Sequence, residues 1–166
     1  MRQVNPKHID MLINLANRAP YLEHMSFKVC ELGTGYSKVE MDIHEKHFSP
    51  LGAVHGGVYA TLIDSAAYWA IYCELDENIG YTTLDLSVNY LSMCEKGKII
   101  VEGKSIKIGR NICLAEAFIR DTDGKLIVHG TSKLMLLGDN FSIIKAVAAI
   151  GHPPLPPKFI EGDPGS

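Results

Sequence analysis

The stretch HGGVYATLIDSAAYWAIY, residues 55–72, decides the fold because it is apolar almost all the way round when read at helical spacing. A surface helix carries a polar stripe, so a helix without one is expected to be enclosed by other elements. The stretch contains a single charged residue, Asp64. An unpaired carboxylate in an apolar interior costs several kcal/mol. We therefore expect Asp64 to be compensated by a partner or used in chemistry.

Composition limits the class of protein. The chain has 166 residues, enough for one domain with one core. Its net charge of -3, without a cluster of basic residues, argues against a nucleic-acid partner. No segment approaches the roughly 20 apolar residues of a membrane span, and the N-terminus lacks an apolar signal core. The four cysteines are scattered without a C-x-x-C pair, as is typical of reduced thiols. We expect a soluble cytoplasmic protein that binds no membrane.

Before the long helix, the spacing of apolar residues changes from that of a helix to that of strands. Residues 6–18 have helical spacing after Asn5 and Pro6, which predicts a short amphipathic helix. Alternating runs between residues 27 and 43, interrupted by two glycines, predict a hairpin of half-buried strands. Residues 45–54 contain proline and glycine and are expected to form a loop leading to the helix.

Four extended segments follow the helix, with glycine-containing turns between the last three. They cover residues 83–90, 97–108, 111–122 and 125–137. Their order predicts an antiparallel meander. Two strands, one long apolar helix and four more strands indicate an α+β domain in which a curved antiparallel sheet wraps around a central helix.

The domain is expected to cover residues 1–138, including the N-terminal helix. Residues 139–166 are expected to form a C-terminal extension. Its first part, residues 141–150, has the pattern of a short helix. The rest is rich in proline and is predicted to be an extended, mobile tail.

The length of the helix constrains any chemistry at Asp64. Gly56 and Gly57 open the helix, where amide groups without intrahelical partners attract a phosphate or a developing oxyanion. Asp64 lies eight residues further on, about 12 Å along the axis, so one carbonyl group cannot touch both. If both serve one reaction, two copies of the chain must share the site across a two-fold axis. The alternative is that Asp64 bonds a neighbouring loop and specifies packing.

The motif H-G-G-x6-D at residues 55–64, entered through PLGAV at 50–54, resembles the hotdog-fold acyl-CoA thioesterases of the phenylacetate-pathway and human thioesterase-superfamily type. The strand TTLDLSVNYL at 82–91 and the turn KIGRN at 107–111 continue the resemblance, which runs from about residue 27 to residue 137. It implies a hotdog fold with five or six strands around one long helix. It also implies homodimers with a continuous sheet, often paired into homotetramers, and hydrolysis of acyl-CoA or aryl-CoA thioesters.

The resemblance also implies roles for individual catalytic residues. Asp64 corresponds to the general base or nucleophile, and these two routes stay open. The Gly56 amide corresponds to the oxyanion donor from the other subunit, His55 lies near the thioester sulfur, and Thr83 helps to place the water. Ser49 stands where the family commonly has an asparagine that holds the water or the carbonyl. Serine has a shorter reach and fewer hydrogen-bonding groups, so this departure puts that role in doubt.

Substrate-binding roles follow in the same way. The turn with Lys107, Gly109 and Arg110 corresponds to the place where the family binds the nucleotide phosphates of coenzyme A. The alternative for its two cations is that they are solvated turn charges. Gly57 belongs to the helix start, and Tyr68 is a candidate for lining the acyl tunnel, although helix aromatics are more often core residues.

The sequence supports other functions less well. A non-catalytic acyl-CoA binding or sensing module is the main alternative, because Ser49 departs from the family pattern and the chain carries an extension after residue 138. Hydration of an enoyl-CoA requires a histidine and acid pairing that the sequence does not place. The segment His44–His47 lacks the spacing of H-E-x-x-H, so we expect no metal and no cofactor.

Overall fold

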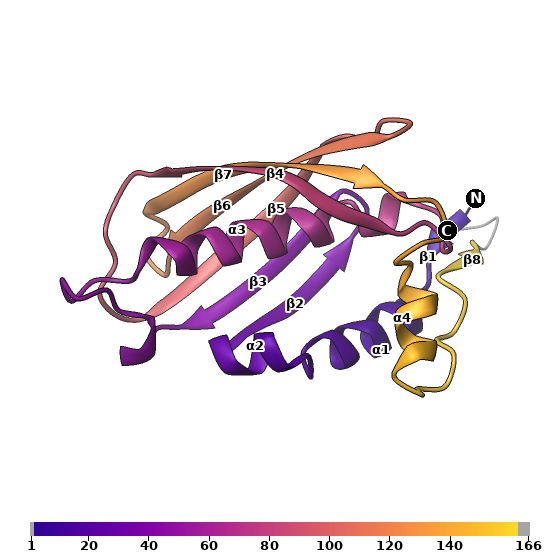
Figure 1. Ribbon diagram of the computed structural model, residues 1–166, viewed down its shortest axis with the longest axis horizontal. Helices are drawn as coiled ribbons and strands as arrows, with labels where there is room; N and C mark the ends of the chain where they lie inside the picture. The colour runs from indigo at the N-terminus through magenta and orange to yellow at the C-terminus, as the bar shows by residue number, and fades with distance from the viewer. Residues whose placement is uncertain (1, 163–166) are drawn as a thin grey trace.

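The computed structural model describes residues 2–162 of the chain. A six-stranded antiparallel sheet curves around one long helix, in the strand order β2-β3-β5-β6-β7-β4 (Figure 1). A second, two-stranded sheet joins β1 to β8. The larger sheet consists of β2 (Phe27–Gly33), β3 (Tyr36–Asp42), β4 (Tyr81–Tyr90), β5 (Lys98–Lys107), β6 (Ile112–Asp121) and β7 (Leu126–Leu136). The α+β fold is therefore confirmed, with six strands.

The remaining elements flank this sheet. The long helix is α3, and α1 and α2 lie along β2 (Figure 1). Their bounds are β1 (Arg2–Val4), α1 (Pro6–Ala16), α2 (Pro20–Met25), α3 (Gly56–Ala70), α4 (Ile143–Ala149) and β8 (Phe159–Glu161), with short 3-10 helices at Glu45–His47 and Tyr72–Glu74. Helix α2 and the two three-residue strands were not predicted from the sequence.

The predicted meander is wrong for β4. This strand pairs with β7 at one edge of the sheet, whereas β5 pairs with β3 from Tyr36↔Lys104 to Asp42↔Lys98. Of the four strands after α3, only β5, β6 and β7 follow one another as neighbours in the larger sheet. Alternation identifies strands but not their partners. The free side of β3 is filled by β5, so β4 takes the opposite edge.

Two glycines let α3 lie very close to the sheet. A Cβ atom on Gly103 of β5 would stand 2.3 Å from the Ala66 carbonyl oxygen and 2.5 Å from Ser37 Oγ. A Cβ atom on Gly130 of β7 would stand 2.6 Å from Cγ2 of Ile63. The Ser37 hydroxyl donates a hydrogen bond of 2.6 Å to the Ala66 carbonyl, which ties the middle of the helix to β3. Larger residues at these positions would push the helix away.

The helix has two unlike faces. The face toward the sheet is fully buried and consists of Leu62, Ile63, Ala66, Ala67 and Ala70. The opposite face is half-buried in the single chain and carries Thr61, Asp64, Ser65, Tyr68 and Trp69. The sheet therefore curves around the helix, as expected, but it leaves this one face only half-buried in the single chain.

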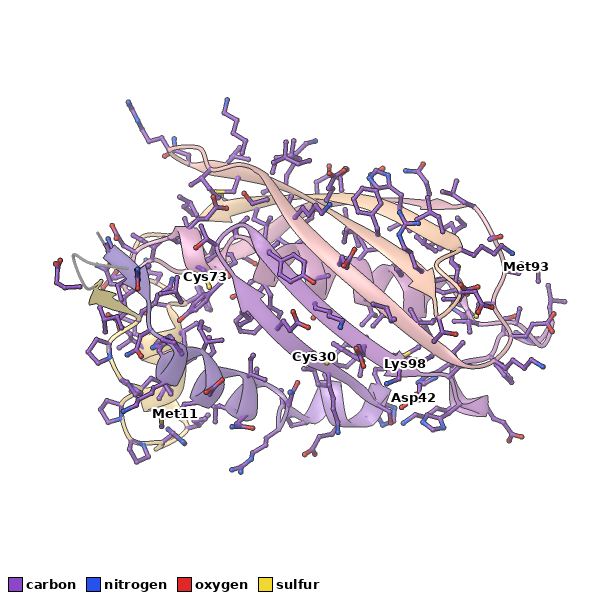
Figure 2. All side chains as sticks on the ribbon, turned by 180° about the vertical axis from the view of Figure 1, so that it is seen from behind. Met11, Cys30, Asp42, Cys73, Met93 and Lys98 are labelled. Atoms are coloured by element: carbon purple, nitrogen blue, oxygen red, sulfur yellow. The ribbon has the colours of Figure 1, made fainter. Side chains whose placement is uncertain are left out.

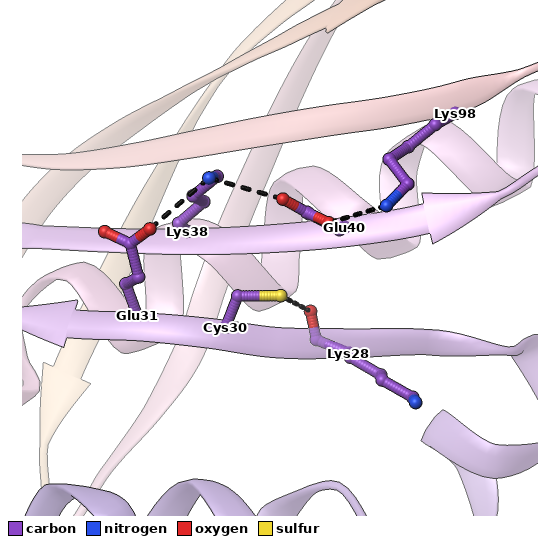
Figure 3. Close-up of polar contacts among 6 residues, drawn as sticks. All are labelled: Lys28, Cys30, Glu31, Lys38, Glu40 and Lys98. Atoms are coloured by element: carbon purple, nitrogen blue, oxygen red, sulfur yellow. Dashed lines mark hydrogen bonds and ion pairs between the residues drawn. The ribbon is translucent and has the colours of Figure 1, made fainter. Parts of the chain in front are cut away.

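The outer face of the sheet is charged. Lys38 lies 3.3 Å from both Glu31 and Glu40, and Lys98 lies 3.0 Å from Glu40 (Figure 3). Cys30 projects from the same face, near Lys98 (Figure 2). Partial burial, reinforced by the Glu40 carboxylate, raises the pKa of the Cys30 thiol. This face alternates polar residues outward, as the sequence predicts for half-buried strands.

The C-terminal extension folds back onto the N-terminal end of the chain. The Asn5 amide donates to the Lys158 carbonyl (2.8 Å), and β8 pairs with β1. Lys158 is 1% exposed, and its ammonium group donates to the carbonyls of Tyr72 and Leu75 and lies 3.7 Å from the centre of the Tyr72 ring. Burial lowers the pKa of Lys158 to about 8. Residues 152–161 are therefore not a free tail.

The prediction of a mobile C-terminal tail failed for a physical reason. Proline-rich composition predicts an extended backbone, and much of the segment is extended, but the carbonyl acceptors that hold Lys158 come from residues over eighty positions away. Residues 163–166 of the predicted tail lie outside the described range. The domain boundary at residue 138 stays a prediction.

We predict that Gly103→Ala lowers the free energy of unfolding by about 2 kcal/mol or more, because overpacking forces helix and sheet apart. Urea denaturation measured by circular dichroism checks this. Gly33→Ala is the matched control, since a Cβ atom at Gly33 meets nothing within 4 Å. Equal midpoints for the two variants would contradict the close approach of α3.

Candidate active site

The start of α3 is capped by His55. This residue has an extended backbone, with φ -65° and ψ 138°, and its Nδ1 accepts a hydrogen bond of 2.9 Å from the Gly57 amide. Because Nδ1 accepts, a neutral His55 carries its proton on Nε2, which faces outward as a donor. The Gly56 amide is at the first helical position and has no intrahelical acceptor.

A cavity of about 270 Å³ lies in front of this helix start. Its lining includes Ser49, Leu51, Gly56, Tyr59, Tyr90 and Met93. The structure thus brings Ser49 and Gly56 together, as the resemblance implies for two groups of one site. Met93 marks this end of the molecule, far from Cys73 at the other end (Figure 2).

Tyr90 from β4 closes one side of this cavity. Its hydroxyl donates to the Gly56 carbonyl at 3.1 Å, and a Cβ atom on Gly56 would meet the Tyr90 ring at 3.3 Å. Ser49 is held locally, because its Oγ accepts from the Leu51 amide at 3.3 Å. Sequence reasoning did not include Tyr90, since nothing in the strand pattern indicates which end of β4 meets the helix.

Asp64 is held by a strand rather than by a loop. The Thr83 hydroxyl of β4 donates a hydrogen bond of 2.7 Å to Asp64 Oδ1. A bulge between Thr83 and Asp85 interrupts the register of β4 with β7. Thr83 therefore turns toward the helix while Leu84 is left 50% exposed. The strict alternation of apolar and polar residues from Thr83 onward would place Thr83 outward and Leu84 inward, but the bulge reverses the faces on its two sides.

A second cavity, of about 300 Å³, opens beside Asp64. Its lining is mainly apolar and comprises Tyr21, Leu22, Phe27, Thr61, Asp64, Ser65, Tyr68 and Trp69. Tyr21 reaches the helix, with its hydroxyl 2.8 Å from Thr61 Oγ1. The part of this wall that α2 supplies was missed from the sequence, although Pro20 is a recognisable first-turn proline.

Tyr68 lies one turn beyond Asp64 on the same face of α3. Burial raises the pKa of the Tyr68 hydroxyl; the nearby Asp64 carboxylate adds to this and Tyr81 partly opposes it.

The two cavities share no lining residue. Ser49 and Gly56 belong to the first, and Asp64 belongs to the second. Within α3 the Gly56 and Asp64 positions are about 12 Å apart. A single chain therefore presents two partial sites, one with amide donors and one with a carboxylate.

The turn between β5 and β6 lies apart from both cavities. A Cβ atom on Gly109 would stand 2.2 Å from the Ile112 carbonyl oxygen, so the tight turn requires glycine. Lys107 and Arg110 are exposed, and neither forms an ion pair within residues 2–162. Their charges are available to a ligand that approaches from outside the chain.

The segment from His44 to His47 is held by local hydrogen bonds. His47 is buried; its Nε2 bonds the Met25 carbonyl at 2.8 Å and its Nδ1 accepts from the His44 amide at 3.0 Å. Over residues 2–162 no group of three or more His, Cys, Asp or Glu side chains is arranged to hold a metal ion. In the same range no helix is long and apolar enough to cross a membrane.

Residues 51–128 match the sequence profile of the Thioesterase superfamily. This range, a little under half of the chain, is a Thioesterase superfamily domain. The matched range contains the His55–Asp64 motif, Thr83 and the 107–110 turn, and it leaves out Ser49 and the C-terminal extension. The predicted family is thus confirmed, and the hotdog fold with it.

Named relatives also point to thioesterases. Acyl-coenzyme A thioesterase 13 from Mus musculus is 32% identical over 93 residues, which cover 55% of this chain and 66%, just under two thirds, of that protein. The Homo sapiens protein of the same name is 26% identical over 123 residues, which cover 72% of this chain and 87% of its own. The names of these relatives support thioester hydrolysis as a general reaction class.

Solved structures share the fold. A thioesterase from Haemophilus influenzae superposes with a TM-score of 0.73 at 23% identity, over 80% of this chain and 92% of that chain. A variant of the phenylacetic acid degradation protein PaaI from Thermus thermophilus superposes with a TM-score of 0.66 at 22% identity, over 72% and 100% of the two chains. At these identities the likeness concerns the fold alone.

We predict that His55→Ala lowers the free energy of unfolding by about 1 kcal/mol, because the Gly57 amide loses its cap acceptor. His55→Asn keeps an acceptor at this position and is expected to unfold at nearly the wild-type midpoint. Thermal denaturation of both variants checks this. An equal loss in the two would show that the cap contributes nothing to the helix start.

Proposed function

We propose that the protein hydrolyses acyl-CoA or aryl-CoA thioesters at a site shared by two copies of the chain. The observation that carries the proposal is the separation of the two partial sites. Asp64, which accepts a hydrogen bond from Thr83 of β4, lies in the middle of α3. The Gly56 amide lies at the start of the same helix, so the chemistry needs a second helix. The match to the Thioesterase superfamily supports the reaction class.

The free edge of β4 supports a particular dimer. The opposite edge strand, β2, is covered, because the Asn17 side chain both donates to and accepts from the Val29 backbone at 2.9 Å. Among the described elements β4 has β7 on one side and no strand on the other. A ten-residue strand with an open edge is a template for pairing with another chain.

Pairing two β4 strands antiparallel would assemble the site. The Thr83 end of one strand would lie beside the Tyr90 end of the other. Thr83 bonds Asp64, and Tyr90 bonds Gly56, so this pairing carries Gly56 of the partner subunit toward Asp64. A two-fold axis makes two such sites. Pairing of these homodimers into a homotetramer is part of the proposal by family resemblance.

In such a site each group has a task. The thioester carbonyl would point at the Gly56 amide of the partner subunit, where the helix start stabilises the oxyanion. Asp64 would remove a proton from water, whose oxygen attacks the carbonyl, or would attack directly and form a mixed anhydride that water then cleaves. The Thr83 hydroxyl would orient Asp64. As the C–S bond breaks, the Nε2–H group of His55 of the partner subunit would face the leaving thiolate.

The coenzyme A moiety would remain outside the acyl cavity. Lys107 and Arg110 are exposed cations of the turn between β5 and β6, and phosphate groups are bound well by such side chains. Coenzyme A is part of the substrate here, and the reaction as proposed needs no bound cofactor.

We predict that Asp64→Asn lowers kcat for acyl-CoA hydrolysis at least about 100-fold, since it removes the base or nucleophile while keeping the shape. A thiol-release assay over short, long and aromatic acyl-CoAs measures this. Asp42→Asn, which changes an exposed carboxylate at the end of β3, is the matched control. Near-wild-type turnover by Asp64→Asn would exclude both chemical routes.

A mixing experiment tests the shared site. Gly56→Pro removes the amide donor, while proline suits the first helical position and His55 already has the extended backbone that precedes proline. Gly56→Pro and Asp64→Asn are each expected to be inactive. Co-expressed, they should regain about a quarter of the wild-type rate, because half of random dimers contain one intact site. No recovery in demonstrably mixed dimers would place both groups in one chain.

One observation favours a second function, non-catalytic binding or sensing of acyl-CoA. The Ser49 hydroxyl is engaged by the Leu51 amide rather than presented freely, so the group that would hold the water is weakened. This function predicts saturable binding of acyl-CoA by calorimetry with no thiol release above background. Measured release by the wild type, abolished in Asp64→Asn, would exclude it.

A further inference from the structure

The C-terminal extension places one aromatic ring on the open face of α3. Phe141 is 78% exposed, and it has a positive φ of 56°, a conformation that bulky residues rarely adopt. An exposed phenylalanine in a strained conformation is unfavourable for a free chain. Such outliers persist where the surroundings enforce them, often at functional sites.

The surroundings of Phe141 do enforce its position. Gly80 exchanges backbone hydrogen bonds with Leu137 and Gly138, at 2.8 and 2.6 Å. A Cβ atom on Gly80 would stand 1.8 Å from the Asn140 carbonyl oxygen, so only glycine lets this segment approach. On the other side the buried Ser142 caps α4, accepting from the Lys145 amide at 3.4 Å. The backbone at Phe141 is thus held from both sides.

The ring borders a cavity that continues the one beside Asp64. This cavity of about 330 Å³ is lined by Tyr68, Tyr81, Thr82, Leu137 and Phe141. Tyr68 also lines the Asp64 cavity. Thr82 precedes Thr83, which bonds Asp64. The two cavities thus meet at Tyr68, with Asp64 in the wall of one and Phe141 in the wall of the other.

We propose that Phe141 is a specificity-determining residue that closes the far end of the acyl groove and so sets the longest acyl chain that binds well. This inference rests on the proposed function, in which the thioester carbonyl lies at Asp64. An apolar acyl chain starting there would run past Tyr68 and end against the Phe141 ring. A chain too long for the groove would have to displace that ring.

Substitutions at Phe141 test this without endangering the fold. Phe141→Asn removes the ring and supplies a residue that tolerates positive φ. Phe141→Trp enlarges the ring. Ile150→Ala is the matched control, since Ile150 is an exposed apolar residue of the same extension and lines none of the cavities described above.

Two measurements use the full-length chain. The first is kcat/KM for saturated acyl-CoAs from hexanoyl to palmitoyl. The second is the affinity for the matching S-alkyl-CoA thioethers, which cannot be hydrolysed. For both measurements, the ratio between the longest and the shortest chain should be about tenfold higher for Phe141→Asn than for the wild type. The reason is that several additional methylenes of the long chain become buried. Phe141→Trp should shift the preference toward shorter chains, and Ile150→Ala should leave it unchanged.

The outcomes separate the two proposals. Thioether profiles that are the same for the wild type and both Phe141 variants would overturn the role of Phe141, whether or not thioesters are hydrolysed. Absence of thiol release by the wild type would overturn the proposed hydrolysis. In that case a length shift in thioether affinity would still support Phe141 as the end of the acyl groove.

Discussion

The close approach of α3 to the sheet is the constraint on which the rest of the structure depends. At Gly103 and Gly130 there is no room for a Cβ atom, and the Ser37 hydroxyl bonds the Ala66 carbonyl across the contact. Small residues on the helix complete this contact, with Ala66, Ala67 and Ala70 fully buried. A helix held at this depth is a straight, rigid rod whose other face is left for function.

That rod explains why the site is divided. The amide donors at Gly56 and the carboxylate of Asp64 lie on one inflexible element, and their separation cannot be shortened by bending it. The structure places a different strand contact at each position: Tyr90 beside Gly56 and Thr83 beside Asp64. Because both contacts come from the edge strand β4, assembly of the proposed site and assembly of the proposed dimer are one event.

Much of the fold could be predicted because its features are periodic. The hairpin, the long helix and the strands after it have clear patterns, and the H-G-G motif identified the family. Features that depend on pairing could not be predicted. β4 lies beside β7 because β5 already fills the free side of β3. The inward turn of Thr83 follows from a bulge that no sequence pattern indicates. Tyr90 and Tyr21 adjoin the site only through the tertiary arrangement.

The closure of the chain ends has a consequence for biosynthesis. Asn5 bonds the backbone of Lys158, and His8 lies 2.6 Å from the Pro156 carbonyl, so the N-terminal helix and the last strand complete each other across nearly the whole chain. Loops of that length close late, after local hairpins have formed. The first helix therefore finds its final partners only after residues 156–158 have been synthesised, and until then His8 and Tyr72 lack their contacts with Pro156 and Lys158.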